Sequence, residues 1–206
     1  MSLITTYCHL SADHFSVNGE LVATREKDAA DSWFKQIYKE QEIVYPKFYK
    51  MDALSQAGFL ASEVIKRVNK GLASKYQDDE IAMLFANQSS SADTDLRFLH
   101  SYEQNGAPSP SLFVYTLPNI VLGEIAIRNK WFGENMFAVL PKFAPGFFVD
   151  YGQIFLSTGA KAVLVGWLEV MGDQIEVFVA LVESESEGGM DFNKHNLSKL
   201  AGLSHA

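Results

Sequence analysis

The chain has 206 residues, of which 48% are hydrophobic and 20% charged, a composition typical of a globular domain and not of a disordered chain. Its net charge of −8 argues against nucleic-acid binding as the main task, because neutralising phosphates needs an excess of Lys and Arg. We find no apolar window long enough for a membrane span and no signal-peptide pattern, and Cys8 is the only cysteine. We therefore expect a cytoplasmic protein without an intrachain disulfide.

The first half of the chain predicts strands and helices in turn. A first strand is predicted over 3–10, and a hairpin over 13–24 turns at Asn18-Gly19. Helical spacing of apolar residues predicts a helix over 28–40 and an amphipathic helix over 52–68, with Asp52 as its N-cap. A buried strand follows over 80–87.

The second half continues the alternation. The predicted elements are a helix over 94–104, a helix from Pro118 to Arg128, a strand over 136–140, an apolar helix over 143–156, strands over 162–169 and 174–183, and a short helix over 193–202. This alternation predicts an α/β fold with a mostly parallel sheet, helices on both faces and a C-terminal hairpin at one edge. We place the domain at 1–183 and an acidic, polar tail at 184–206.

Local motifs point to no metal or cofactor. Asp93-Thr94-Asp95 has the spacing of a cation site, but acids at a helix N-terminus are favoured by the helix dipole alone. The five histidines, His9, His14, His100, His195 and His205, show no ligand spacing. The serines at 89–91 follow a strand and are candidates to line a site at the carboxyl end of a sheet.

Four stretches in order resemble the N-terminal half of a β-ketoacyl synthase. They are KFYKMDALSQAGFLASEVIKR (47–67), IAMLFANQSSSADTDLRFL (81–99), SPSLFVYTLPNIVLGEIAIRNKWFGENMFAV (109–139) and GAKAVLVGWLEV (159–170). The resemblance implies a thiolase-like fold whose N-terminal half is a mixed five-stranded sheet between helices. It covers about 45–170, and more loosely 1–183.

The sequence departs from this family at the position that carries its chemistry. The resemblance implies a nucleophilic cysteine at the N-terminus of a buried helix, where the helix dipole stabilises a thiolate. Counting forward from Gly133 places that cysteine at about Lys142, and the neighbourhood from Leu140 to Phe143 holds no Cys, Ser or Thr. The family also takes two catalytic histidines from a C-terminal half, which we expect to be absent from this chain.

The helix after Lys142 is apolar nearly all round, which favours an interface. Burying each large apolar side chain gains roughly 1.5–3 kcal/mol, so leaving them exposed would favour aggregation. We expect a second copy of this chain or a full-length ketosynthase to cover this face, or alternatively the hairpin at 162–183 and the tail to fold back over it. The predicted interface residues are Phe143, Phe147, Phe148, Tyr151 and Phe155.

Two functions of different classes follow. The first is a catalytically inactive partner, similar to a chain-length factor, that serves a condensing enzyme in fatty acid, polyketide or aryl polyene assembly. The alternative is a reduced acyltransferase or an acyl-binding protein acting on acyl thioesters, with a pocket formed by Ser89, Asn119, Lys142 and Phe143. An acyl carrier protein is a possible further partner, and because carrier proteins are acidic it would need the basic residues Lys47, Lys50, Lys66, Arg67 and Lys70.

Overall fold

The structure is a computed structural model that describes residues 2–203. Its strands are β1 (Leu3–Ser11), β2 (His14–Val17), β3 (Glu20–Thr24), β4 (Ile81–Asn87), β5 (Asn135–Val139), β6 (Ala162–Met171), β7 (Gln174–Glu183) and β8 (Met190–Asp191). Its helices are α1 (Trp33–Glu40), the 3-10 helix η1 (Pro46–Lys50), α2 (Ala53–Val68), α3 (Leu72–Lys75), α4 (Ala92–Asn105), α5 (Pro110–Phe113), α6 (Ile120–Asn129), α7 (Pro145–Thr158) and α8 (Lys194–Ala201). No helix in this part of the chain is both long and apolar enough to cross a membrane.

The strands form one mixed sheet in the order β3-β2-β1-β7-β6-β4-β5, with β8 paired to β1. The only parallel pairs among the described strands are β4–β5 and β4–β6, and the other pairings are antiparallel. The expected mixed sheet is therefore confirmed, whereas the expectation of a mostly parallel one is wrong. The sheet has eight described strands because the N-terminal hairpin and β8 extend it.

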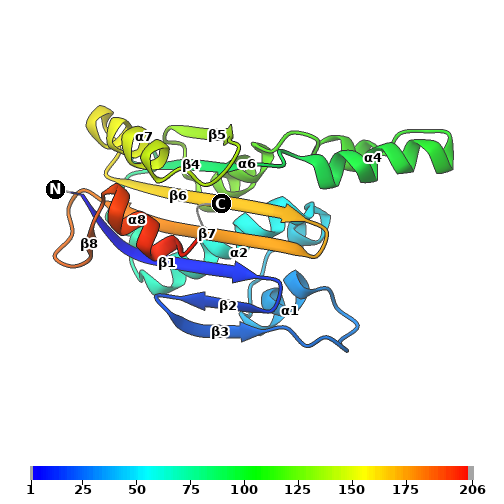
Figure 1. Cartoon of the computed structure of the whole chain (residues 1–206), viewed down its shortest axis with the longest axis horizontal. Helices are drawn as coiled ribbons and strands as arrows, with labels where there is room; N and C mark the ends of the chain where they lie inside the picture. The colour runs from blue at the N-terminus through cyan, green and yellow to red at the C-terminus, as the bar shows by residue number, and fades with distance from the viewer. Residues whose placement is uncertain (1, 204–206) are drawn as a thin grey trace.

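The return strand β7 lies in the middle of the sheet and not at an edge. It pairs with β6 over its whole length and with β1 on its other side (Figure 1). Such a strand is buried on both faces, as the run of buried residues at its C-terminal half shows. The hairpin at 162–183 therefore forms the centre of the fold.

Helices cover both faces of the sheet, as expected. One face packs against α1, α2 and α6, and the other packs against α7 and α8. In Figure 1, α8 crosses in front of β1 and β7 while α2 lies behind them, and α4 extends away from the sheet. Strand β4 carries seven buried residues in a row because both of its faces are covered.

Three helices begin two or more residues later than the sequence predicted. Helix α6 begins at Ile120 and not at Pro118, and Asn119 is its N-cap. The first helix starts at Trp33 and not at 28, because Ser32 is extended and the polar residues before it form a loop. Helix α7 starts at Pro145, whose fixed φ and missing N–H suit the first helical position. Lys142 and Phe143 consequently lie in the loop before α7 and not in its first turn.

The segment after residue 183 contributes to the core. Phe192, Leu197 and Ala201 are buried on the α7 side of the sheet, and Asn193 caps α8 by accepting a hydrogen bond from the Asn196 N–H at 2.9 Å. The sequence there is polar on average, yet one stripe of α8 is apolar and packs inward. His205, in the same tail, lies outside the described residues.

Candidate site at the carboxyl edge of the parallel strands

The carboxyl ends of β4 and β5 bring two candidate loops together. Parallel neighbours end at the same edge of a sheet, so the loops after Asn87 and after Val139 are adjacent there. The Leu140 N–H donates to the Asn87 carbonyl at 2.8 Å and joins the loops directly. The predicted residues Ser89 and Lys142 therefore lie on neighbouring loops.

The serine-rich loop after β4 is held by two side chains. Asn87 is fully buried, accepts from the Ser90 N–H at 2.9 Å and donates to the Ser90 carbonyl at 2.8 Å. This clamp allows Ser90 its left-handed φ of 53°, which is unfavourable for a residue with a side chain. Glu169 on β6 accepts hydrogen bonds from the main-chain N–H groups of Gln88 (2.7 Å) and Ser89 (3.2 Å). The loop is thus fixed by the sheet itself.

Asn87 and Glu169 were not predicted as site residues. The signal available in the sequence was an acid near the end of an otherwise apolar strand, at 162–171. Glu169 therefore positions the loop by accepting these two main-chain N–H groups.

Lys142 lies at the surface, whereas its neighbour Phe143 is buried. Lys142 is exposed, whereas Phe143 is only 7% exposed. The Phe143 ring stacks on Phe148 with centroids 5.4 Å apart and meets Trp167 edge-on at 6.1 Å. Phe143 anchors the loop in the core, and the position to which the resemblance assigns the nucleophile carries a cation at the surface.

Trp167 carries an unusual buried donor beside Phe143. Its side chain is 3% exposed, and its indole N–H has no hydrogen-bond acceptor among residues 2–203. Such a group costs free energy, because its hydrogen bond to water is lost without replacement.

Ser89 and Asn119, the other predicted pocket residues, act through their main chains. Asn119 is exposed at the start of α6, where its carbonyl accepts from the Leu122 N–H at 3.1 Å. Within the described chain, no histidine ring or carboxylate accepts a hydrogen bond from the Ser89 hydroxyl. A serine nucleophile requires such a base. The predicted acyl pocket remains a prediction.

The predicted interface on α7 is largely occupied by the chain itself. Phe143, Phe148 and Phe155 are buried in the core, while Phe147 is half-buried and Tyr151 is 38% exposed. Three of the five predicted interface residues are therefore buried by the chain itself, and an interface role of Phe147 and Tyr151 stays a prediction.

The covering element is α8 with the segment before it. A Cβ on Gly152 of α7 would lie 2.9 Å from the Phe192 ring, so this close approach requires glycine. Lys194 pairs with Asp150 of α7 at 3.5 Å. The tail thus folds back over α7, as the alternative in the sequence analysis proposed.

Exposed apolar side chains are most frequent in the stretch from residue 96 to residue 139, whose exposed part we call the α4–β5 surface. Nine of the fifteen exposed large hydrophobic side chains in the described chain lie between residues 96 and 139. They are Leu96, Leu99, Tyr102, Phe113, Val114, Leu117, Ile127, Phe132 and Val139. They belong to α4, α5, α6, β5 and the intervening loops, and β5 ends the strand order without a described neighbour on its outer side.

The predicted basic patch is partly neutralised. Lys47 lies 2.8 Å from Glu124, and Lys66 pairs with Glu63. Arg67 donates to the side chain and carbonyl of Gln41. The two ion pairs reduce the charge available to an acidic partner, whereas the hydrogen bonds of Arg67 to the neutral Gln41 restrict its side chain without neutralising it.

Comparison with known proteins identifies solved structures that have a similar fold. No family model matches the sequence, and no curated protein matches it. Among solved structures, one chain of the ketosynthase in complex with its chain length factor from Xenorhabdus doucetiae matches with a TM-score of 0.63 at 16% identity, over 98% of this chain and 91% of that one. The chain has a ketosynthase-like fold.

Two further structures share this ketosynthase-like fold. The ishigamide ketosynthase/chain length factor matches with a TM-score of 0.66 at 17% identity, over 91% of this chain and 63% of that one. A type II polyketide synthase acyl-carrier protein in complex with its ketosynthase bound to the hexaketide matches with a TM-score of 0.60 at 13% identity, over 88% of this chain and 62% of that one. The chain therefore spans about three fifths of the length of these two and nearly all of the first.

Proposed function

We propose that this chain is a non-catalytic subunit, similar to a chain length factor, that pairs with a ketosynthase in the assembly of polyketide, aryl polyene or fatty acyl chains. The observation that carries the proposal is the combination of a ketosynthase-like fold with an exposed Lys142 where the resemblance puts the nucleophilic cysteine. A lysine in a surface loop lacks the buried apolar surroundings that activate lysine nucleophiles.

The only cysteine is unsuited to replace the missing nucleophile. Cys8 lies on β1 and is fully buried beneath α2, with its Sγ 4.0 Å from the Ala61 carbonyl. Burial raises the pKa of the Cys8 thiol to about 12, so the thiol stays protonated near neutral pH. Condensation chemistry would therefore have to come from the partner.

The α4–β5 surface supports a partner. Apolar patches of this kind on a protein surface are typical of interaction sites, and an edge strand with unpaired main-chain groups is open to pairing with another chain. Two of the similar structures pair a ketosynthase with a chain length factor. We assign the ketosynthase contact to this surface, with a second copy of this chain as the competing occupant.

Carrier-protein docking is assigned to the ketosynthase and not to this chain. Lys47, Lys66 and Arg67 are engaged within the chain. In this proposal the carrier protein docks on the ketosynthase of a cytoplasmic complex. A complex that contains the Lys66→Glu/Arg67→Glu variant should therefore bind the carrier protein as tightly as the wild-type complex does.

Chain elongation by the complex tests whether this subunit is catalytic. The ketosynthase recovered with this chain from its native cells is assayed with the wild-type subunit and with Lys142→Ala. We expect rates within about twofold of each other, because removing a true nucleophile costs on the order of a thousandfold or more. Loss of activity of that size in Lys142→Ala, with the complex intact, would contradict the proposal and favour the acyltransferase alternative.

A further inference from the structure

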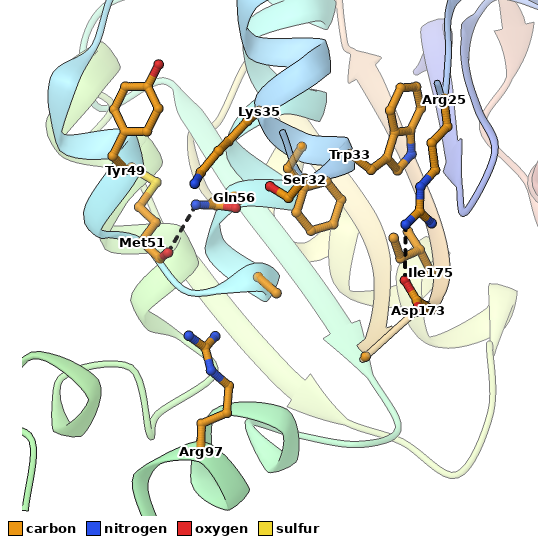
Figure 2. Close-up of a pocket in the computed structure, with 13 residues that line it drawn as sticks. Arg25, Ser32, Trp33, Lys35, Tyr49, Met51, Gln56, Arg97, Asp173 and Ile175 are labelled. Carbon is orange, nitrogen blue, oxygen red and sulfur yellow. Dashed lines mark hydrogen bonds and ion pairs between the residues drawn. The ribbon is translucent and has the colours of Figure 1, made fainter. Parts of the chain in front are cut away.

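A further cleft lies on the α1 side of the sheet. It has a volume of about 390 Å³ and is formed by α1, the segment around η1, the start of α2, α4 and the turn between β6 and β7 (Figure 2). Its lining includes three cations, Arg25, Lys35 and Arg97, and one acid, Asp173. We call it the cationic cleft. This excess of positive charge is notable in a chain with a net charge of −8.

Two of the three cations are uncompensated by direct pairs. Arg25 lies 3.3 Å from Asp173, but neither Lys35 nor Arg97 makes an ion pair with a residue of the described chain. Lys35 is half-buried on α1, and Arg97 reaches toward the cleft from α4 in Figure 2. Two further acids lie near these groups: the buried Asp52, whose pKa is raised by burial and lowered in part by the positive charge of Arg97, and Asp93, which accepts from the Gly172 N–H at 3.0 Å.

The buried side-chain amide of Gln56 adds a hydrogen-bond acceptor to these cationic donors. Gln56 is 9% exposed, and its Nε2 donates to the carbonyls of Phe48 and Met51, both at 3.2 Å. Its Oε1 is therefore turned the other way and accepts no hydrogen bond from residues 2–203; Figure 2 shows it directed toward Ser32. Ser32 precedes α1, and its hydroxyl makes no capping bond.

We propose that the cationic cleft binds a small phosphorylated organic molecule that carries a hydroxyl or amide donor. Lys35 and Arg97, on one side of the cleft in Figure 2, would hold the phosphate, aided by the first N–H groups of the eight-residue helix α1. Arg25, on the other side, would hold a further oxygen of the ligand. The donor of the ligand would satisfy Gln56 Oε1. The volume is within the range of small-molecule sites. This inference does not depend on the partner proposed above.

Asp173 provides a direct test of the proposal, because its carboxylate competes with the ligand for Arg25. Its side chain is 90% exposed on the β6–β7 turn, and Asn is equally suited to such a turn. Asp173→Asn should therefore leave the fold unchanged and tighten binding, which a purely structural role of the Arg25 pair would not do.

Calorimetric titration of the full chain with glycerol 3-phosphate, inorganic phosphate and glycerol tests the site. We expect saturable binding of the phosphates and none of glycerol. Lys35→Gln and Arg97→Gln should each weaken binding about five- to tenfold, since each removes a charge-assisted hydrogen bond. Asp173→Asn should tighten it about two- to threefold by removing the competing charge. Lys39→Gln, on the same helix but paired with Asp31, is the matched control and should leave affinity unchanged.

The outcomes separate the sources of the ligand. Tighter binding of the ester than of inorganic phosphate would support the role of Gln56, whereas equal affinity would assign the cleft to the free anion. Absence of saturable phosphate binding by the wild type would overturn the proposal. The proposal would also be overturned if Asp173→Asn bound phosphate with the affinity of the wild type and Lys35→Gln and Lys39→Gln lost affinity equally.

Discussion

Two buried tryptophans differ in the partner of their indole N–H. Trp33 donates to the Ser11 carbonyl at 2.8 Å, whereas Trp167 has no acceptor in the described chain. Both side chains are 3% exposed, so the loss of volume on changing Trp to Phe is comparable. We expect Trp33→Phe to lower the free energy of unfolding by about 1 kcal/mol more than Trp167→Phe, because only the former breaks a hydrogen bond. Urea denaturation of both variants measures the difference, and an equal loss would show that Trp167 has an acceptor in solution.

Glu183 connects three segments that are distant in sequence. It accepts hydrogen bonds from Thr5 (2.6 Å), Lys75 (2.7 Å) and the Tyr76 hydroxyl (2.7 Å). Burial raises the pKa of this carboxyl, but the hydrogen bonds from Lys75, Thr5 and Tyr76 outweigh burial and leave the pKa below its usual 4.5. An acid whose pKa is lowered by folding stabilises the fold above its unfolded pKa, and this contribution is lost as pH falls through the folded pKa.

Glu183→Gln should therefore destabilise the chain in a pH-dependent way. We expect a loss of about 1–2 kcal/mol at neutral pH, a figure reduced for solvent screening of the partly exposed Lys75, and a smaller loss at about pH 3.5. The exposed Glu187→Gln is the control in the same segment. Chemical denaturation at both pH values gives the comparison, and equal losses at both would refute the charge-based explanation.

At the residue scale, sequence patterns predicted local roles such as helix capping, but they did not predict contacts between residues far apart in the sequence. Asp52 was predicted as an N-cap and accepts from the Ser55 N–H at 2.9 Å, because capping depends on residues three apart. The roles of Glu169 and Glu183 were not predictable, because each rests on partners about 80 or more positions away. Strand pairing brings these partners together, and local periodicity does not specify it.

Helix α2 packs closely against α6 and the sheet through one glycine. A Cβ at Gly58 would lie 2.5 Å from Val121 of α6 and 2.7 Å from Leu168 of β6, so even one methyl group would force these elements apart. Gly123 on α6 is the opposite case, since it is exposed and has open space around its Cα.

Alanine at these two glycines should change stability in opposite directions. We expect Gly58→Ala to cost about 1–3 kcal/mol through overpacking, and Gly123→Ala to gain about 0.5–1 kcal/mol through helix propensity. Thermal denaturation of both variants measures the two effects. A stabilising Gly58→Ala would mean that α2 and α6 are more loosely packed than the structure shows.

At the element scale, the position of most helices and strands could be predicted, but their neighbours could not. The apolar character of α7 was evident from its phenylalanines, yet the element that covers it, α8, has a mostly polar sequence with buried Leu197 and Ala201. Its burial depends on a position beside α7 that results from the path of the whole chain. The same reasoning explains why β7 was expected at an edge.

At the scale of the whole molecule, the two edges of the sheet differ in character. Edge strand β3 carries Leu21, which is 63% exposed and follows Glu20. Edge strand β5 carries Val139, which is 53% exposed and belongs to the α4–β5 surface. An aspartate at either position is expected to be compatible with the monomer fold, because both side chains are exposed. If the β5 edge is the interface, only the aspartate at Val139 should weaken the complex with the ketosynthase.

Affinity purification of the tagged chain from its native cells, followed by native mass spectrometry, tests the central claim most directly. The account predicts a one-to-one complex with a ketosynthase for the wild type and for Leu21→Asp, and loss of that complex for Val139→Asp, because burying a charge in an interface costs several kcal/mol. Recovery of the chain only by itself, or a ketosynthase complex that survives Val139→Asp and is lost in Leu21→Asp, would contradict it.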